Sequence, residues 1–158
     1  MTSSGPVAPL SGATADDVNS WQRTASRAAH PSAVGAVLEA GDLLAEIAAG
    51  LGRVTVPAEL ADRPVTRFSR ELVLTTPAYD VWIMHWPAGT MADLHSHDQH
   101  VAFHVVSGEL LEQRVTVDGT RSLLRTAGST TVVPPHTPHR LSSTTDTTTV
   151  HVHAKDPQ

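Results

Sequence analysis

Short β-type runs separated by turn signals make up the chain from Pro64 to its last residues, and this pattern restricts the possible folds most strongly. The runs that predict strands are residues 65–74, 79–86, 100–106, 110–117, 122–125, 130–133 and 147–153. Glycine turns, such as those at Gly89 and Gly108, help to separate them at short and fairly regular intervals. This spacing is typical of an all-β sandwich or barrel. The Ser/Thr-rich residues 142–149 are expected to form a turn.

Two helices are predicted before the β-type runs. Residues 16–30 begin with acidic side chains and carry apolar residues at helical spacing, which predicts a short amphipathic helix. A second helix is predicted from Ser32 to about Ala49, with Ser32 as its N-cap and with Gly50 and Gly52 as its stop signals. We therefore expect a helical segment that leads into the β-type region.

Length and charge limit the class of protein. The 158 residues suit one domain, with residues 1–15 as a flexible lead and residues 16–158 as the folded part, helical over 16–52 and a β-barrel over 64–154. The net charge of −5 does not suggest binding to nucleic acid or to an anionic membrane. No apolar run reaches the ~18–20 residues of a membrane span, and no secretory signal is recognisable. We expect a cytoplasmic protein that is monomeric or weakly homo-oligomeric.

Histidine is abundant and cysteine is absent, with counts of ten and zero. The lack of cysteine removes disulfide frameworks, thiolate metal sites and cysteine nucleophiles. His95 and His97 form an H-x-H pair, whose side chains point to the same side of a strand and can reach one metal ion. Such a pair alone is a weak signal, because about 0.6 pairs are expected by chance at this histidine content. His151 and His153 form a second pair.

Glycines at fixed distances frame the first pair. Five residues separate Gly89 from His95, and ten residues separate His97 from Gly108. Glycine suits the tight turns at barrel corners, where a positive φ is often required. Histidines and glycines at such fixed offsets rarely arise by chance, so the pair gains weight as a metal-ligand candidate.

A second framed segment lies downstream, where five residues separate Gly128 from Pro134 and four separate Pro134 from His139. Together the two segments resemble the two motifs of the cupin superfamily. This resemblance implies a mainly β fold, a double-stranded β-helix or jelly-roll-like barrel, behind the short helical segment. Val101 stands where the first motif usually has Glu, and His136 stands where the second usually has Gly.

The candidate metal ligands are His95, His97 and His139. Three neutral imidazoles suit Fe, Zn, Cu or Ni and serve Mg or Ca poorly. With Val101 in place of Glu, the metal would keep its full double charge, which favours an anionic ligand such as a thiolate. His136 is the alternative to His139 as the third ligand, and a cupin that has lost its metal is the alternative to a metal site.

Residues 68–153 resemble the cysteine dioxygenase (thiol dioxygenase) branch of the cupins. Residues 68–73 read Phe-Ser-Arg-Glu-Leu-Val, similar to the family's Tyr-x-Arg-x-Leu-Val, and Trp86 precedes the first ligand by nine residues, as in the family. Residues 139–141, His-Arg-Leu, resemble the family's His-Arg-Val. Residues 149–153, Thr-Val-His-Val-His, resemble its Ser-x-His-x-Tyr.

The resemblance implies an Fe(II) ion, held by His95, His97 and His139, that converts a small carboxylate-bearing thiol and O₂ to a sulfinic acid. L-Cysteine is the expected substrate, and Phe68 and Trp86 are expected to line its pocket. The alternatives are 3-mercaptopropionate or another mercapto-acid as substrate, a different three-histidine oxygenase, and a metal-binding cupin without catalysis.

The resemblance also implies roles for three further residues. Arg70 matches the arginine that holds the substrate carboxylate, a task for which the guanidinium fork is well shaped. His151 matches the histidine of the family's Ser-His-Tyr relay, with Thr149 in place of the serine. His153 stands where the family has Tyr, and an imidazole there could still donate a hydrogen bond to the reactants.

Overall fold

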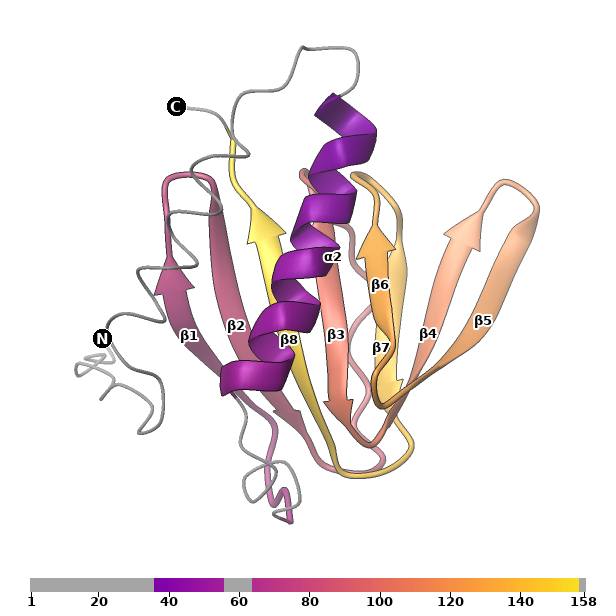
Figure 1. Ribbon diagram of the computed structural model, residues 1–158. Coiled ribbons are helices and arrows are strands. Elements are labelled where there is room, and N and C mark those ends of the chain that lie inside the picture. Colours follow the sequence, from indigo (N-terminus) through magenta and orange to yellow (C-terminus); the bar gives the residue numbers. More distant parts are fainter. Residues whose placement is uncertain (1–35, 56–63, 157–158) are drawn as a thin grey trace, which may run out of the picture.

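The computed structural model describes residues 36–55 and 64–156 (Figure 1). The helix predicted over residues 16–30 and the N-cap predicted at Ser32 lie outside these ranges. One helix, α2 (Ala36–Thr55), lies across a five-stranded sheet, and a three-stranded sheet completes the described part. No helix in the described ranges is long and apolar enough to cross a membrane.

In residues 64–156, eight antiparallel strands build the two sheets. They are β1 (Ser69–Thr75), β2 (Tyr79–Trp86), β3 (Val101–Ser107), β4 (Glu109–Thr116), β5 (Gly119–Thr126), β6 (Thr130–Val133), β7 (His139–Ser143) and β8 (Thr147–Ala154). The order is β1-β2-β8-β3-β6 in the first sheet and β5-β4-β7 in the second. The predicted mainly β fold with a helical segment is therefore confirmed.

The turn predicted over residues 142–149 is wrong for most of its length. Its first two residues end β7, and β8 begins at Thr147, so only residues 144–146 connect the strands. Thr147, Thr148 and Thr149 are completely buried. Threonine is β-branched and packs well on a pleated surface, so a threonine run of this kind is compatible with a strand as well as with a turn.

The predicted stop signals in the helix are also wrong, because α2 continues through Gly50 and Gly52 to Thr55. A Cβ atom on Gly52 would lie only 2.5 Å from Cδ2 of His104 on β3. Glycine at this position therefore lets the helix approach the sheet closely.

The five-stranded sheet has a hydrophobic cluster on each face. On β8, Val150 and Val152 pack under α2, together with the helix residues Leu44 and Leu51. The opposite face packs against the second sheet through a cluster of eight buried residues: Met84, Trp86, Val101, Phe103, Val105, Leu110, Val133 and Leu141. Side chains alternate along a strand, so Thr149, His151 and His153, which alternate with the two valines of β8, face this second cluster.

Candidate metal centre

The segment with His95 and His97 runs antiparallel to β7 but is not a regular strand. The backbone N–H of His95 donates to the carbonyl of His139 at 2.9 Å, and the reverse bond measures 2.8 Å. Met91 pairs with Ser142 and His95 pairs with His139, so four residue steps oppose three. The extra residue is a bulge, which changes the direction of the side chains that follow. The H-x-H pair thus lies on a bulged, extended segment, and its prediction on a regular strand is wrong in this respect.

The three predicted metal ligands lie together. Ligand nitrogens of His95, His97 and His139 all lie within 4.8 Å of one another. Nε2 of His97 is 3.2 Å from Nε2 of His139. Metal–imidazole bonds of about 2.0–2.1 Å place two ligand nitrogens of one ion about 3 Å apart, so this spacing fits a shared metal ion. His95 is exposed and His139 is buried, so the cluster is open on one side.

Hydrogen bonds orient two of these imidazoles. Nδ1 of His95 is 2.8 Å from the carbonyl oxygen of Asp93, and Nδ1 of His139 is 3.3 Å from Oε1 of Glu112. Both partners can only accept, since a carbonyl and an ionised carboxylate have no proton to give, and each Nδ1 therefore donates. The lone pair is then on Nε2 in both rings, and this nitrogen is available to a metal ion.

Glu112 was not predicted as a site residue. Its completely buried carboxylate accepts from Nε of Arg114 at 2.7 Å and from Nη2 of Arg125 at 2.7 Å. Burial raises its pKa, but hydrogen bonds from His139 and the two arginines outweigh burial and lower the pKa to about 2. One feature of the sequence could have indicated this burial: Glu112 lies two residues after Leu110 in a strand, so both side chains point to the inner face.

His136 does not join the cluster among the described residues. Its φ of 56° is in the left-handed region, which agrees with the glycine usual at this place in the resembling motif. The exposed Nδ1 lies 3.9 Å from a carboxylate oxygen of Asp98. Of the two alternatives for the third ligand, the geometry favours His139.

Thr149 and His151 form a buried pair on the inner face of β8. Oγ1 of Thr149 lies 2.9 Å from Nε2 of His151 and accepts a hydrogen bond from Nε1 of Trp86 at 3.0 Å. The ring of Phe103 stacks on His151 at 5.3 Å between centroids. Burial, and then the charges that neighbouring histidines would carry, lower the pKa of His151 well below its ordinary value, so this ring is neutral at pH 7.

His153 lies next to the cluster. Its ring is 5.1 Å from that of His97, and its buried Nε2 has no hydrogen-bond partner among the described residues. Burial lowers its pKa to about 4, although the charge of Asp80 acts in the opposite direction. His153 on β8 pairs with the buried Val101 on β3. Val101 stands at the position where the resembling motif has a carboxylate.

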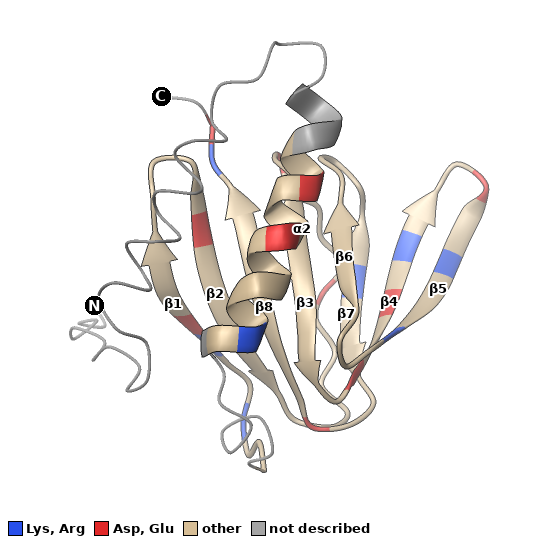
Figure 2. Cartoon of the chain, viewed as in Figure 1, with Lys and Arg blue, Asp and Glu red and all other residues tan. Residues whose placement is uncertain are grey.

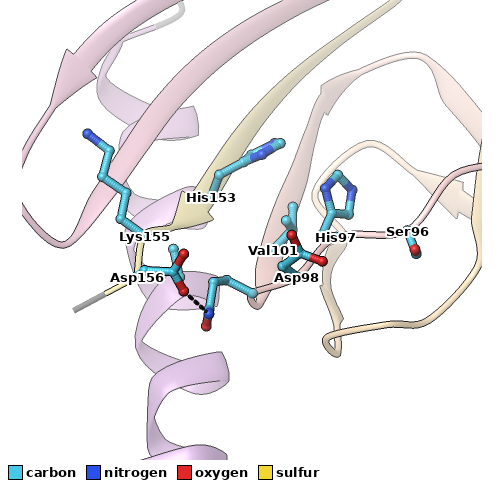
Figure 3. A pocket seen from close by; sticks show the side chains of 9 residues that line it. Ser96, His97, Asp98, Val101, His153, Lys155 and Asp156 are labelled. Carbon is cyan, nitrogen blue, oxygen red and sulfur yellow. Dashed lines mark hydrogen bonds between the residues drawn. The ribbon is translucent and has the colours of Figure 1, made fainter. Parts of the chain in front are cut away.

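A pocket of about 430 Å³ opens beside His97 and His153, whose rings both line it (Figure 3). Val101 and Lys155 also contribute to its wall. Nζ of Lys155 is 2.7 Å from a carboxylate oxygen of Asp80, so this cation is already paired. The pocket gives a small molecule access to one of the candidate ligands.

The residues predicted to bind substrate, Arg70, Phe68 and Trp86, do not line this pocket. Arg70 is exposed on β1, where it pairs with Met84, and its Cζ lies 5.3 Å from the ring centroid of Trp82. Phe68 packs edge-on against the buried Trp86, with centroids 4.8 Å apart. Their contact with substrate stays a prediction.

Comparison with known proteins supports this architecture. Residues 82–154 match the family model described as a cupin domain. Solved structures with a similar fold include a cupin superfamily protein from Desulfitobacterium hafniense DCB-2, with 12% identity over 64% of this chain and 89% of that one and a TM-score of 0.54. The predicted double-stranded β-helix is therefore confirmed.

Two more neighbours have the same fold. An rmlc-like cupin family protein with a double-stranded beta-helix fold from Methanocaldococcus jannaschii is 15% identical over 61% of this chain and 87% of that one, with a TM-score of 0.52. KdgF from Halomonas sp. is 19% identical over 64% of this chain and 94% of that one, with a TM-score of 0.51. No curated protein matches the chain significantly in sequence. None of the three structures is described as a thiol dioxygenase.

Proposed function

We propose that the protein, whose residues 82–154 match the cupin domain model and whose three-histidine cluster could hold a metal ion, is an Fe(II)-dependent thiol dioxygenase. Its substrate would be a small carboxylate-bearing thiol, with L-cysteine the leading candidate. The thiol and O₂ would combine to a sulfinic acid. Both oxygen atoms end on the sulfur, which supplies all the electrons that O₂ takes up, so the reaction balances without a further reductant.

The donor set is the observation that carries the proposal. Three imidazoles converge in the cluster, and the apolar Val101 is buried where the resembling motif has a carboxylate. Three neutral ligands leave the charge of a divalent ion uncompensated, which favours an anionic fourth ligand and lowers the pKa of a bound thiol. Iron at this place would supply the redox chemistry that activates O₂.

The chain's own contribution to the reaction would include hydrogen bonds from the inner face of β8. Oγ1 of Thr149 lies 2.9 Å from Nε2 of His151, and the charges that His97 and His139 would carry help burial to lower the pKa of this imidazole. We assign His151 a hydrogen bond to the reacting oxygen species. The unpartnered Nε2 of His153, next to His97, is a second candidate for this role.

Arg70 would hold the substrate carboxylate. No hydrogen bond or ion pair joins its guanidinium to another described residue, and its one described contact is with the face of Trp82. Its donors are therefore available to a carboxylate, which a guanidinium binds in a bidentate manner. The positive charge of Arg70 also disfavours protonation of His153, so the two side chains are within electrostatic reach.

An oxygen-electrode assay of the Fe(II)-loaded protein tests the proposal. Cysteine, 3-mercaptopropionate, mercaptosuccinate and cysteamine would be compared, with the sulfinate product quantified. We expect O₂ uptake and matching sulfinate with at least one carboxylate-bearing thiol. Arg70→Gln should lower kcat/KM about 10–100-fold for these thiols, the cost of losing a charged bidentate contact, and leave cysteamine unaffected. Arg67→Gln, at an exposed neighbouring position, is the matched control.

The same assay separates the alternatives. Faster turnover of 3-mercaptopropionate than of cysteine would transfer the assignment to a mercapto-acid. A protein that binds iron yet consumes no O₂ with any of these thiols would overturn the proposal and leave a metal-binding cupin without this catalysis.

A further inference from the structure

The buried carboxylate of Glu112 lies behind His139, on the side of the ring away from His97. A completely buried carboxylate is costly unless charges and hydrogen bonds compensate it. Here three side chains donate to it: Arg114 from its own strand β4, Arg125 from β5 and His139 from β7. All three strands of the second sheet therefore meet at this carboxylate.

The two arginines are bound differently. Arg114 reaches beyond Glu112 and donates from Nη2 to the carbonyl of Val132 at 2.7 Å, which ties it to the five-stranded sheet. Arg125 donates to Glu112 through both Nε and Nη2, at 3.0 and 2.7 Å. It is the half-buried residue of β5, whose other residues are exposed. Figure 2 shows acidic and basic segments on β4 and basic segments on the neighbouring β5.

The charges of this network act on His139 in opposite directions. Glu112 attracts the proton on Nδ1 of His139, which makes Nε2 a better electron donor. The two arginines carry two positive charges against one negative charge and so weaken the effect of Glu112. If the network only stabilised the fold, the loss of Glu112 and the loss of an arginine would both loosen it, and their effects on His139 would have the same sign.

We propose that Glu112 is a positioning residue that fixes the orientation and the Nδ1 proton of His139 for metal binding, and that Arg125 limits its effect. The inference rests on the metal site of the proposed function and not on thiol oxidation. It makes the exposed β5 strand, through Arg125, a determinant of metal affinity at a ligand on β7.

Zn²⁺ affinity of the purified full chain, measured by competition with a chromophoric chelator, tests this role. Glu112→Gln keeps the side chain's shape and should weaken Zn²⁺ binding about 10–100-fold, as is typical for a lost partner of a metal-bound histidine. Arg125→Gln keeps a hydrogen-bond donor but removes a positive charge, and it should tighten Zn²⁺ binding severalfold. Glu109→Gln, on the same strand with its side chain near Thr144, is the control without effect.

Opposite signs for the two variants support the inference, and equal signs overturn it. Should Glu112→Gln not fold, Arg125→Gln decides alone, because unchanged or weaker Zn²⁺ binding in that variant contradicts the proposed limit on Glu112. A protein that binds Zn²⁺ in this pattern but oxidises no thiol would refute the proposed function and leave this inference standing. A wild-type protein that binds no Zn²⁺ would overturn it.

Discussion

His139 and His151 are buried histidines on different sheets, and their hydrogen-bond partners differ in charge. His139 on β7 faces the carboxylate of Glu112, which two arginines hold. His151 on β8 faces the neutral hydroxyl of Thr149, which also accepts from the indole of Trp86. The first environment is an ion-pair network and the second contains no charged partner for the imidazole in the described residues.

The difference indicates a division of labour between the sheets. A carboxylate partner fixes the Nδ1 proton and strengthens Nε2 as a donor, which suits a metal ligand. A hydroxyl partner in an apolar surrounding keeps the imidazole neutral and fixed, which suits a hydrogen bond to reactants. Under the proposed function, the three-stranded sheet would orient the candidate ligand His139, and the five-stranded sheet would contribute His151 to the chemistry beside the metal.

The largest expected effect follows from removal of the ligand on the three-stranded sheet. His139→Ala should weaken metal binding by more than about 100-fold, since a lost ligand costs more than a lost partner of a ligand. Metal content after dialysis against a chelator measures the effect. His136→Gly is the matched control, because it removes a nearby histidine and suits the left-handed backbone. Loss of metal from this control, with retention by His139→Ala, would assign the third ligand to His136.

A smaller effect is expected on the other sheet. Thr149→Val keeps the side-chain shape but leaves the buried donor of Trp86 without its partner, so the free energy of unfolding should fall by about 1–3 kcal/mol. Metal affinity should stay at the wild-type value. Urea unfolding measures the change, with Thr131→Val as control, because the buried hydroxyl of Thr131 has no partner among the described residues. An equal loss in both variants would contradict the Thr149 assignment.

The smallest effects are changes in the pH dependence of stability of the metal-free protein. The lowered pKa values of His151 and His153 mean that the unfolded chain takes up protons first, so stability falls as the pH drops below about 6.5; the loss due to His153 extends down to a pH of about 4. The lowered pKa of Glu112 gives a separate loss as the pH drops from about 4.5 toward 2.

Urea unfolding at a series of pH values can separate these two windows. His151→Gln should reduce the pH dependence only in the upper window, where the lowered pKa values of His97 and His153 still contribute, and Glu112→Gln should reduce it only in the lower one. A change of slope above pH 5 in Glu112→Gln would show that the two sheets are coupled in their titration.

The metal-ligand part of the site was predictable because motif spacing is local in the sequence. The offsets among Gly89, His95 and His97, and between Pro134 and His139, are set by turns and by neighbouring strands. They identified the three histidines that the structure brings together. The bulge before His95 was not predicted, because it depends on pairing with β7, a strand that the sequence pattern did not reveal.

Glu112 illustrates what local patterns do not reveal. A carboxylate in a short strand usually faces solvent, and its burial depends on Arg125, thirteen residues away on another strand, and on His139 on a third. The end of α2 was mispredicted for a similar reason. Gly52 looks like a stop signal until His104, on a distant strand, is known to pack against it.

The proposed function requires that the histidine cluster bind iron for thiol oxidation while the inner face of β8 assists the chemistry. Bound iron and thiol-dependent O₂ uptake, measured on the same samples of wild type, His139→Ala and His151→Gln, test it most directly. We expect iron and O₂ uptake in the wild type, neither in His139→Ala, and iron with strongly reduced uptake in His151→Gln. Iron-loaded wild type that takes up no O₂ with any small thiol would contradict it.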